Sequence, residues 1–268
     1  MENIRQAVER ARAVHGDEQR IGPKPTETSA ARSVSTAQHA AIALKKSHLL
    51  AKRVVSHDGT DARARPYDML RTQVLRSMDL KGSKILAVTS PTPGCGKTLT
   101  AINLALSIAR QPERSVLLVD LDLQKPQVAN YLGLSPESGL LGVLEGRETL
   151  AGAAVCARVG NCQLAVVPTE EATQGSSDWM ASRPMSILLQ QIKRDYQSCL
   201  VILDLPPLLA SDDVISILPQ VDCALLVVAA GISTVSEIEE CSKHLQSTEV
   251  VRVVLNKAEQ NKKAAYYY

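Results

Sequence analysis

The chain has 268 residues, 45% of them hydrophobic, with 30 lysine and arginine residues against 28 aspartate and glutamate residues. This length allows one large core with appendages rather than several full domains. The balanced charge argues against a general nucleic-acid binder, which usually carries a basic surplus. The six cysteines form no close pair, so neither a disulfide scaffold nor a zinc knuckle is expected, and a reducing compartment is favoured. No apolar run approaches the roughly 20 residues of a membrane helix, and the first residues lack the apolar core of a signal peptide.

The first 60 residues differ in composition from the rest. Residues 1–65 carry 12 basic and 7 acidic residues, whereas the remainder carries 18 and 21. Residues 1–14 have the spacing of a short amphipathic helix, 22–38 have the composition of a linker, and 40–55 could form a second helix or remain unordered. We expect a flexible or partly helical extension over 1–60, which is either solvated chain or a docking element for a partner or an acidic lipid surface.

From Pro66 onward, short apolar runs alternate with helical patterns. Each run is nearly continuous, which is typical of strands buried on both faces of a parallel sheet. We therefore expect a doubly wound α/β domain over 61–260, with a mainly parallel sheet and helices on both faces. The expected strands are 84–90, 115–120, 163–168, 199–204, 223–230 and 250–256. The expected helices are 66–78, 99–110, 179–195 and 233–246, with shorter pieces near 126–132 and 139–145.

The first expected strand leads into the segment SPTPGCGKT (90–98), which a helical pattern follows. A strand, a glycine-containing loop and a helix N-terminus make a phosphate cradle, because backbone N–H groups and the helix dipole attract an anion. In such a loop Lys97 would reach the β- and γ-phosphates and the Thr98 hydroxyl would bind Mg²⁺. The strict pattern has glycine where Pro91 stands, so the flanking strand and helix support the prediction. The expected nucleotide-binding residues here are Pro93, Gly94, Cys95, Gly96, Lys97, Thr98 and Leu99.

Three carboxylates follow strands further along the chain. Asp120 and Asp122 come at the end of the second strand, and Asp204 ends the fourth. The carboxyl ends of parallel strands meet at one edge of the sheet, where ligands bind, so these side chains should converge near the phosphates. Phosphoryl transfer needs Mg²⁺ to neutralise charge and a base to orient the nucleophile. One carboxylate suits the metal shell and another suits the base.

These motifs resemble those of the bacterial tyrosine kinases, which share the P-loop ATPase fold of MinD and ParA. The resemblance covers roughly 66–268. In it, SPTPGCGKT looks like the modified Walker A motif, DLDLQKP (120–126) like Walker A′, and DLPP (204–207) like Walker B. The segment VLNK (254–257) also looks like a family feature, and it implies that the asparagine in it contacts adenine.

The resemblance implies an ATP-dependent protein-tyrosine autokinase with ATP and Mg²⁺ as cofactors. The chain ends in the residues KKAAYYY, which resemble the tyrosine cluster that such kinases phosphorylate. The implied residues are Lys97, Asp120, Asp122 and Asp204 for catalysis, Thr98, Asp122 and Asp204 for the metal, Asn256 for the base, and Tyr266, Tyr267 and Tyr268 as acceptors. Asp120 is favoured as the catalytic carboxylate, although the roles of Asp120 and Asp122 could be exchanged.

The N-terminal MENIRQAVERARA resembles the start of the separate autokinases of exopolysaccharide polymerisation and export. This implies a cytoplasmic chain that a membrane-spanning chain-length regulator recruits to the plasma membrane and activates. It also implies a homo-oligomer and a protein-tyrosine phosphatase, and no nucleic-acid partner. Two departures bear on these expectations. The charges of the oligomerisation motif look altered at Arg65, Asp68 and Arg71, and Gln124 stands where arginine is usual.

Two other functions use the same residues. A MinD- or ParA-type regulatory ATPase switch would transfer the phosphoryl group to water. The partition branch of that group carries a signature lysine where Thr92 stands here, so the kinase branch is favoured. The other alternative is a scaffold that binds nucleotide without turnover.

Overall fold

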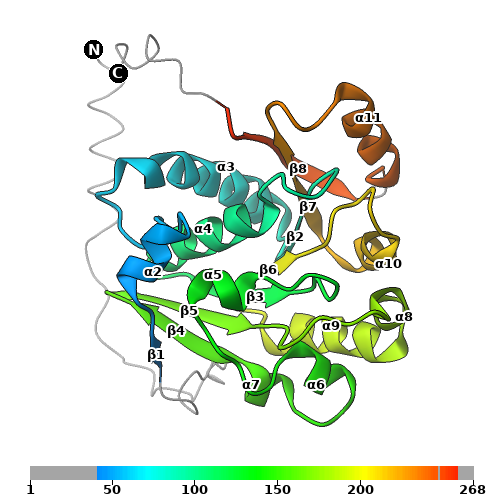
Figure 1. Cartoon of the computed structure of the whole chain (residues 1–268), viewed down its shortest axis with the longest axis horizontal. Coiled ribbons are helices and arrows are strands. Elements are labelled where there is room, and N and C mark those ends of the chain that lie inside the picture. Colours follow the sequence, from blue (N-terminus) through cyan, green and yellow to red (C-terminus); the bar gives the residue numbers. More distant parts are fainter. Residues whose placement is uncertain (1–40, 247, 259–268) are drawn as a thin grey trace, which may run out of the picture. The chain divides into compact units, whose positions relative to one another are not determined.

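An eight-stranded sheet runs through residues 41–246 and 248–258, which are the part of the chain that this computed structural model describes (Figure 1). The strand order is β1-β4-β5-β3-β6-β2-β7-β8, and neighbouring strands are parallel except for the antiparallel pair β4 and β5. The strands are β1 (Ile42–Ala43), β2 (Ile85–Thr89), β3 (Ser115–Asp120), β4 (Val155–Val159), β5 (Cys162–Val167), β6 (Cys199–Asp204), β7 (Cys223–Ala229) and β8 (Glu249–Asn256).

Ten α-helices accompany the sheet in the described residues (Figure 1). They are α2 (Lys46–Ala51), α3 (Arg65–Lys81), α4 (Lys97–Ala109), α5 (Val128–Leu132), α6 (Leu140–Leu144), α7 (Leu150–Ala153), α8 (Ser176–Met180), α9 (Arg183–Asp195), α10 (Asp213–Ile217) and α11 (Val235–His244). Two short 3₁₀ helices, Ala62–Ala64 and Leu218–Gln220, complete the elements. None of the helices described here combines the length and the hydrophobicity that crossing a bilayer requires.

The sheet separates two hydrophobic cores. In β2, Leu86 and Val88 belong to the core that helices α2 to α5 cover, whereas Ile85 and Ala87 belong to the core that α6 to α11 cover. Successive side chains of a strand point to opposite faces, so a strand covered on both faces must be apolar at every position. This explains the apolar runs of β2, β6 and β7, which are buried at every position. It does not explain the run of the edge strand β8, where Val250, Val253 and Leu255 are exposed. The helices on both faces of the sheet confirm the expected doubly wound α/β fold.

Several elements differ from those expected. The helix expected at 179–195 is two helices, because Ser182 caps α9 by accepting a hydrogen bond from the Met185 N–H and Pro184 lies in the first turn of α9. The sequence pattern also missed β4, which alternates in burial and pairs antiparallel with β5. It missed the short helices α7 and α10 as well.

Residues 41–60, which were expected to lie in the extension, form part of the folded unit. Strand β1 adds to the sheet beside β4, and the side chains of Leu49 and Val54 are fully buried in the core. Burial of these apolar side chains stabilises the segment by roughly 1.5–3 kcal/mol each. The expectations for residues 1–40, the tail 261–268 and the acceptors Tyr266, Tyr267 and Tyr268 lie outside the described residues.

Candidate functional site

The loop between β2 and α4 holds two glycines in the left-handed region. Gly94 has a φ of 83° and Gly96 a φ of 92°, which side-chain-bearing residues rarely adopt. A Cβ atom at Gly96 would also collide with the side-chain amide of Asn256, which donates a hydrogen bond of 2.8 Å to the Cys95 carbonyl. The end of β8 is thereby held against the loop, and α4 begins at once with Lys97.

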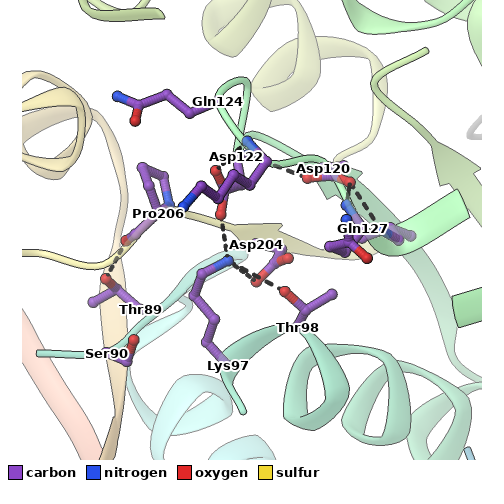
Figure 2. Close-up of polar contacts among 12 residues, drawn as sticks. Thr89, Ser90, Lys97, Thr98, Asp120, Asp122, Gln124, Gln127, Asp204 and Pro206 are labelled. Atoms are coloured by element: carbon purple, nitrogen blue, oxygen red, sulfur yellow. Dashed lines mark hydrogen bonds and ion pairs between the residues drawn. The ribbon is translucent and has the colours of Figure 1, made fainter. Parts of the chain in front are cut away.

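Lys97 lies between two of the expected carboxylates (Figure 2). Its Nζ is 2.8 Å from Asp122 Oδ2 and 3.6 Å from Asp204 Oδ1, and it donates a 3.2 Å hydrogen bond to Thr98 Oγ1. Burial alone would lower the pKa of Lys97, but the charges of Asp204 and Asp122 outweigh it and raise the pKa. The lysine is therefore charged and positioned to meet a phosphate oxygen.

The strand register explains why carboxylates from distant parts of the chain meet. Strands β3 and β6 are neighbours in parallel register, and Asp120 is paired with Asp204 at their carboxyl ends. Asp204 is fully buried, and neither of its carboxylate oxygens accepts a hydrogen bond. Burial raises the pKa of Asp204. The Lys97 ammonium, 3.6 Å from Oδ1, offsets part of this buried charge, but Asp122 shares the same ammonium, so a further cation would stabilise Asp204.

These residues fit a bound Mg²⁺. Hard cations take oxygen ligands, and Mg²⁺ usually keeps one or two protein carboxylates with substrate phosphates and water. Asp204, Asp122 and the Thr98 hydroxyl supply such oxygens beside the loop. Among the described residues no cluster of His, Cys, Asp or Glu forms a cage that would hold a metal by itself. The two carboxylates and the hydroxyl leave coordination positions for phosphate and water oxygens, so they suit a metal bound together with a nucleotide.

Asp120 lies differently from the other two carboxylates. Its Oδ2 accepts hydrogen bonds from the backbone N–H groups of Gln127 and Val128, at 3.0 and 2.9 Å, and its Oδ1 accepts one from Asp122 N–H at 3.2 Å (Figure 2). Burial, followed by the charge of Asp204, raises the pKa of Asp120 to about 8. Asp120 thus fixes the start of α5 and the loop that carries Asp122.

A cavity of about 600 Å³ opens beside the loop. The expected site residues that border it are Pro93, Gly94, Gly96, Lys97, Thr98, Leu99, Asp122 and Asn256. Cys95, Asp120 and Asp204 do not border it, and the Cys95 side chain is fully buried. The structure thus brings the expected residues together from β2, β3, β6 and β8, with most of them facing one space.

Sequence reasoning missed part of the cavity wall. Lys52 and Arg53, directly after α2, border it together with Gln127 and Tyr131 of the α5 region. No sequence pattern signalled them, because they come from segments whose positions depend on long-range packing. The indirect sign in the sequence is Asn103, a polar residue within the apolar pattern of α4, although it does not identify which segment it contacts.

Asn103 is fully buried and holds residues 53–56 against α4. Its Oδ1 accepts hydrogen bonds from the N–H groups of Val55 and Ser56, at 2.9 and 3.0 Å. Its Nδ2 donates to the carbonyl oxygens of Arg53 and Leu99, at 3.3 and 3.0 Å. The side chain thus replaces the backbone partners that this turn lacks, and it fixes the segment at the cavity wall.

The two departures from the family pattern have structural consequences. Gln124 Nε2 donates to Ser176 Oγ at 2.9 Å and approaches Asp213 Oδ2 at 3.4 Å. The buried Asp213 also accepts a 2.6 Å hydrogen bond from Ser177 Oγ, so neutral donors surround it. The glutamine thereby connects the loop that carries Asp122 with α8 and α10.

Of the three charged residues that resemble an oligomerisation motif, Asp68 and Arg71 face α4. Asp68 accepts a 2.5 Å hydrogen bond from Ser107 Oγ and is paired with Arg110. Arg71 donates a 3.0 Å hydrogen bond to the Ser107 carbonyl. Only Arg65 of the three is exposed. The motif contributes at least partly to packing within the chain.

Comparison with known proteins places this architecture in a family. Residues 86–267 match the CobQ/CobB/MinD/ParA nucleotide binding domain, and the chain belongs to this family. It is 30% identical over 201 residues to the tyrosine-protein kinase Etk of Escherichia coli K12, a match that covers 74% of this chain and 27% of Etk. The chain therefore spans about a quarter of the length of this relative.

Two solved structures are similar as well. The kinase domain of the Escherichia coli tyrosine kinase ETK superposes with a TM-score of 0.67 at 27% identity, covering 78% of this chain and 81% of that one. The chimerical protein CapA2B2 has a TM-score of 0.69 at 22% identity, covering 81% and 93%. The similarity to CapA2B2 shows the fold alone, whereas the similarity to the ETK kinase domain is one of both fold and sequence.

Proposed function

We propose that this chain is an ATP-dependent protein-tyrosine kinase that phosphorylates its own C-terminal tyrosines, Tyr266, Tyr267 and Tyr268. The observation that carries this proposal is the placement of Lys97 between Asp122 and Asp204 at the wall of a cavity large enough for a nucleotide. The likeness to the ETK kinase domain supports the choice of reaction.

In the proposed reaction the loop residues bind the phosphates of ATP, and Asn256 lies toward the base. The phenol oxygen of the acceptor forms a bond to the γ-phosphorus, the bond to the bridging oxygen of ADP breaks, and a carboxylate takes the phenol proton. Lys97 stabilises the negative charge on the transferred group. Thr98, Asp122 and Asp204 would hold Mg²⁺, which supplies charge neutralisation between the phosphates.

The proton acceptor is Asp120 or Asp122, and different observations support each. The raised pKa of Asp120 suits proton uptake, whereas only Asp122 borders the cavity. Three backbone amides occupy the oxygens of Asp120. We therefore assign direct contact with the substrates to Asp122 and positioning of its loop to Asp120. With Asp122→Asn, kcat should fall while the loop keeps its protection from hydrogen exchange; with Asp120→Asn, that protection should fall as well.

The proposed cellular role is control of exopolysaccharide polymerisation and export. A membrane-spanning chain-length regulator would recruit the chain to the inner face of the plasma membrane and activate it, and a protein-tyrosine phosphatase would reset the tail. A homo-oligomer, in ring form or smaller, would bring one tail to a neighbouring site. The regulatory ATPase switch and the scaffold without turnover are less favoured, since the named relatives above are tyrosine kinases.

Phosphosite mapping by mass spectrometry tests the proposal. The full chain is purified from its own host, and a Lys97→Met variant is the control. Phosphate on the three C-terminal tyrosines that is absent in the control would support the kinase. An unmodified tail in both proteins contradicts it, and ATP hydrolysis measured on the same samples then separates a switch from a scaffold.

A further inference from the structure

Several basic side chains border the nucleotide cavity. Lys52, Arg53, Lys125 and Lys257 border the cavity, and none of them forms an ion pair with a carboxylate that the structure describes. Arg53 and Lys125 are exposed. Lys97, in contrast, is already engaged by two carboxylates. The positive charge at the mouth is therefore available to an anion.

Lys52, Arg53 and Lys125 lie at one end of the cavity, and Lys257 follows Asn256 at the other. Lys125 follows β3, and Lys52 Nζ lies 6.0 Å from the ring centre of Tyr131 in α5, which also follows β3. Asn256, at the end of β8, lies on the other side of the loop, because the strand order runs β3-β6-β2-β7-β8. If the base lies at Asn256, the γ-phosphate points toward β6 and β3. The end that carries Lys52, Arg53 and Lys125 is then the end at which an acceptor would enter.

The backbone at Arg53 is held in an unfavourable conformation. The described chain has two non-glycine residues with positive φ, Arg53 at 60° and Lys257 at 58°, and both border this cavity. Such strain persists only where the surroundings fix it, and it gathers at functional sites. Here Asn103 fixes it by accepting two backbone hydrogen bonds from residues 55 and 56. The protein therefore tolerates an unfavourable backbone conformation at Arg53, and this conformation keeps Lys52 and Arg53 at the cavity.

We propose that Lys52, Arg53 and Lys125 form a subsite for a phosphotyrosine that neighbours the target tyrosine in the acceptor segment. This inference rests on the proposed kinase function and names the acceptor class, a segment that already carries a phosphate. A phosphotyrosine carries about −1.5 to −2 charges and three strong acceptor oxygens, which match a lysine and an arginine side by side. The chain ends in three adjacent tyrosines. A first phosphate there would favour the next transfer.

The test compares two acceptor peptides, Ala-Ala-Tyr-Tyr-Tyr and the same peptide with the last tyrosine phosphorylated. The full chain is incubated with Mg-ATP, and kcat/KM for each peptide is read by mass spectrometry. We expect the phosphorylated peptide to be preferred about tenfold, as charge-assisted hydrogen bonds allow. The preference should fall to about twofold or less in Lys52→Gln/Arg53→Asn, and rising salt should weaken it in the wild type.

Control variants distinguish charge from folding. Asparagine tolerates the left-handed backbone at position 53, and Lys52→Arg keeps the charge, so it should keep the preference. Lys45→Gln makes the same charge change at an exposed residue before α2 that does not border the cavity, and it should behave as wild type. Equal kcat/KM for both peptides in the wild type overturns the proposal, as does a preference that survives in the double variant. If Lys52→Gln/Arg53→Asn changes only the KM for ATP, the two residues contact ATP and not the acceptor, and the proposal is overturned as well.

A binding measurement separates this inference from the kinase function. Fluorescein-labelled versions of both peptides are titrated with the full chain in the presence of a non-hydrolysable ATP analogue, and anisotropy is recorded. Suppose that the chain transfers no phosphate to either peptide, but the phosphopeptide binds more tightly and this difference requires Lys52 and Arg53. The subsite then stands and the kinase proposal fails. If the peptides are phosphorylated but bind equally, the subsite fails alone.

Discussion

Replacement of the buried Asn103 by alanine gives the sharpest test of how the cavity wall is held. The change removes the acceptor for the N–H groups of Val55 and Ser56, two residues that are 3% and 0% exposed. Leaving a buried donor unpaired costs about 1–3 kcal/mol, so two such donors cost about 2–6 kcal/mol. We expect the unfolding free energy to fall by about 3 kcal/mol or more.

Urea unfolding of the full chain, followed by circular dichroism, measures this loss. In a chain of this size the melting temperature should fall by about 2–4 °C for each kcal/mol. Hydrogen exchange should show lost protection at the amides of residues 55 and 56. Asn130→Ala is the matched control, because the side chain of that exposed asparagine donates a hydrogen bond from Nδ2 to Gln127 Oε1, and the backbone bonds of Asn130 stay in place. If both variants lose the same stability, the reasoning about Asn103 is refuted.

Three further predictions concern the nucleotide site. Asp120 has a pKa of about 8 in the folded chain against an ordinary value of 3.8, so between these pH values the folded chain keeps a proton that the unfolded chain has lost. The unfolding free energy should therefore fall as pH rises from 5 toward 8, and Asp120→Asn should flatten the slope; an unchanged slope in urea titrations at several pH values would contradict this. Gly96→Ala should weaken binding of a fluorescent ATP analogue about tenfold or more, because residue 96 has a positive φ and a Cβ atom there would collide with Asn256. Gly146→Ala is the control and should keep the affinity: residue 146 also has a positive φ, but a Cβ atom there would meet no other atom. EDTA should weaken ATP binding in the wild type and have a much smaller effect in Asp204→Ala; equal effects would exclude Asp204 from the metal shell.

Much of the sheet could be predicted from local pattern. The strands β2, β3, β5, β6, β7 and β8 are largely apolar, and each lies within about one residue of its expected position. The phosphate loop could be predicted for a similar reason, since glycine positions, a lysine and a following helix form one short stretch of chain. Asp122 and Asp204 were expected near this loop because parallel strands end at a common edge.

Other features depend on partners far away in the chain. Strand β1 has two residues, and it exists because β4 lies beside it, more than 100 residues away. Asp120 looked like Asp122 in sequence, but the backbone amides at the start of α5 determine where its carboxylate points. Lys52 and Arg53 carry no motif, and their place at the cavity follows from the hydrogen bonds of Asn103.

The sequence by itself determined the fold class, the phosphate loop and the acidic residues that accompany it, because each of these features depends on a short stretch of consecutive residues. Only the tertiary structure decided which carboxylate faces the cavity, which segment closes its wall and where unpaired positive charge gathers. The physical reason is that burial and hydrogen bonding between distant segments set these positions. A local pattern reports which residues favour a strand or a helix, but not which backbone amide a side chain will meet.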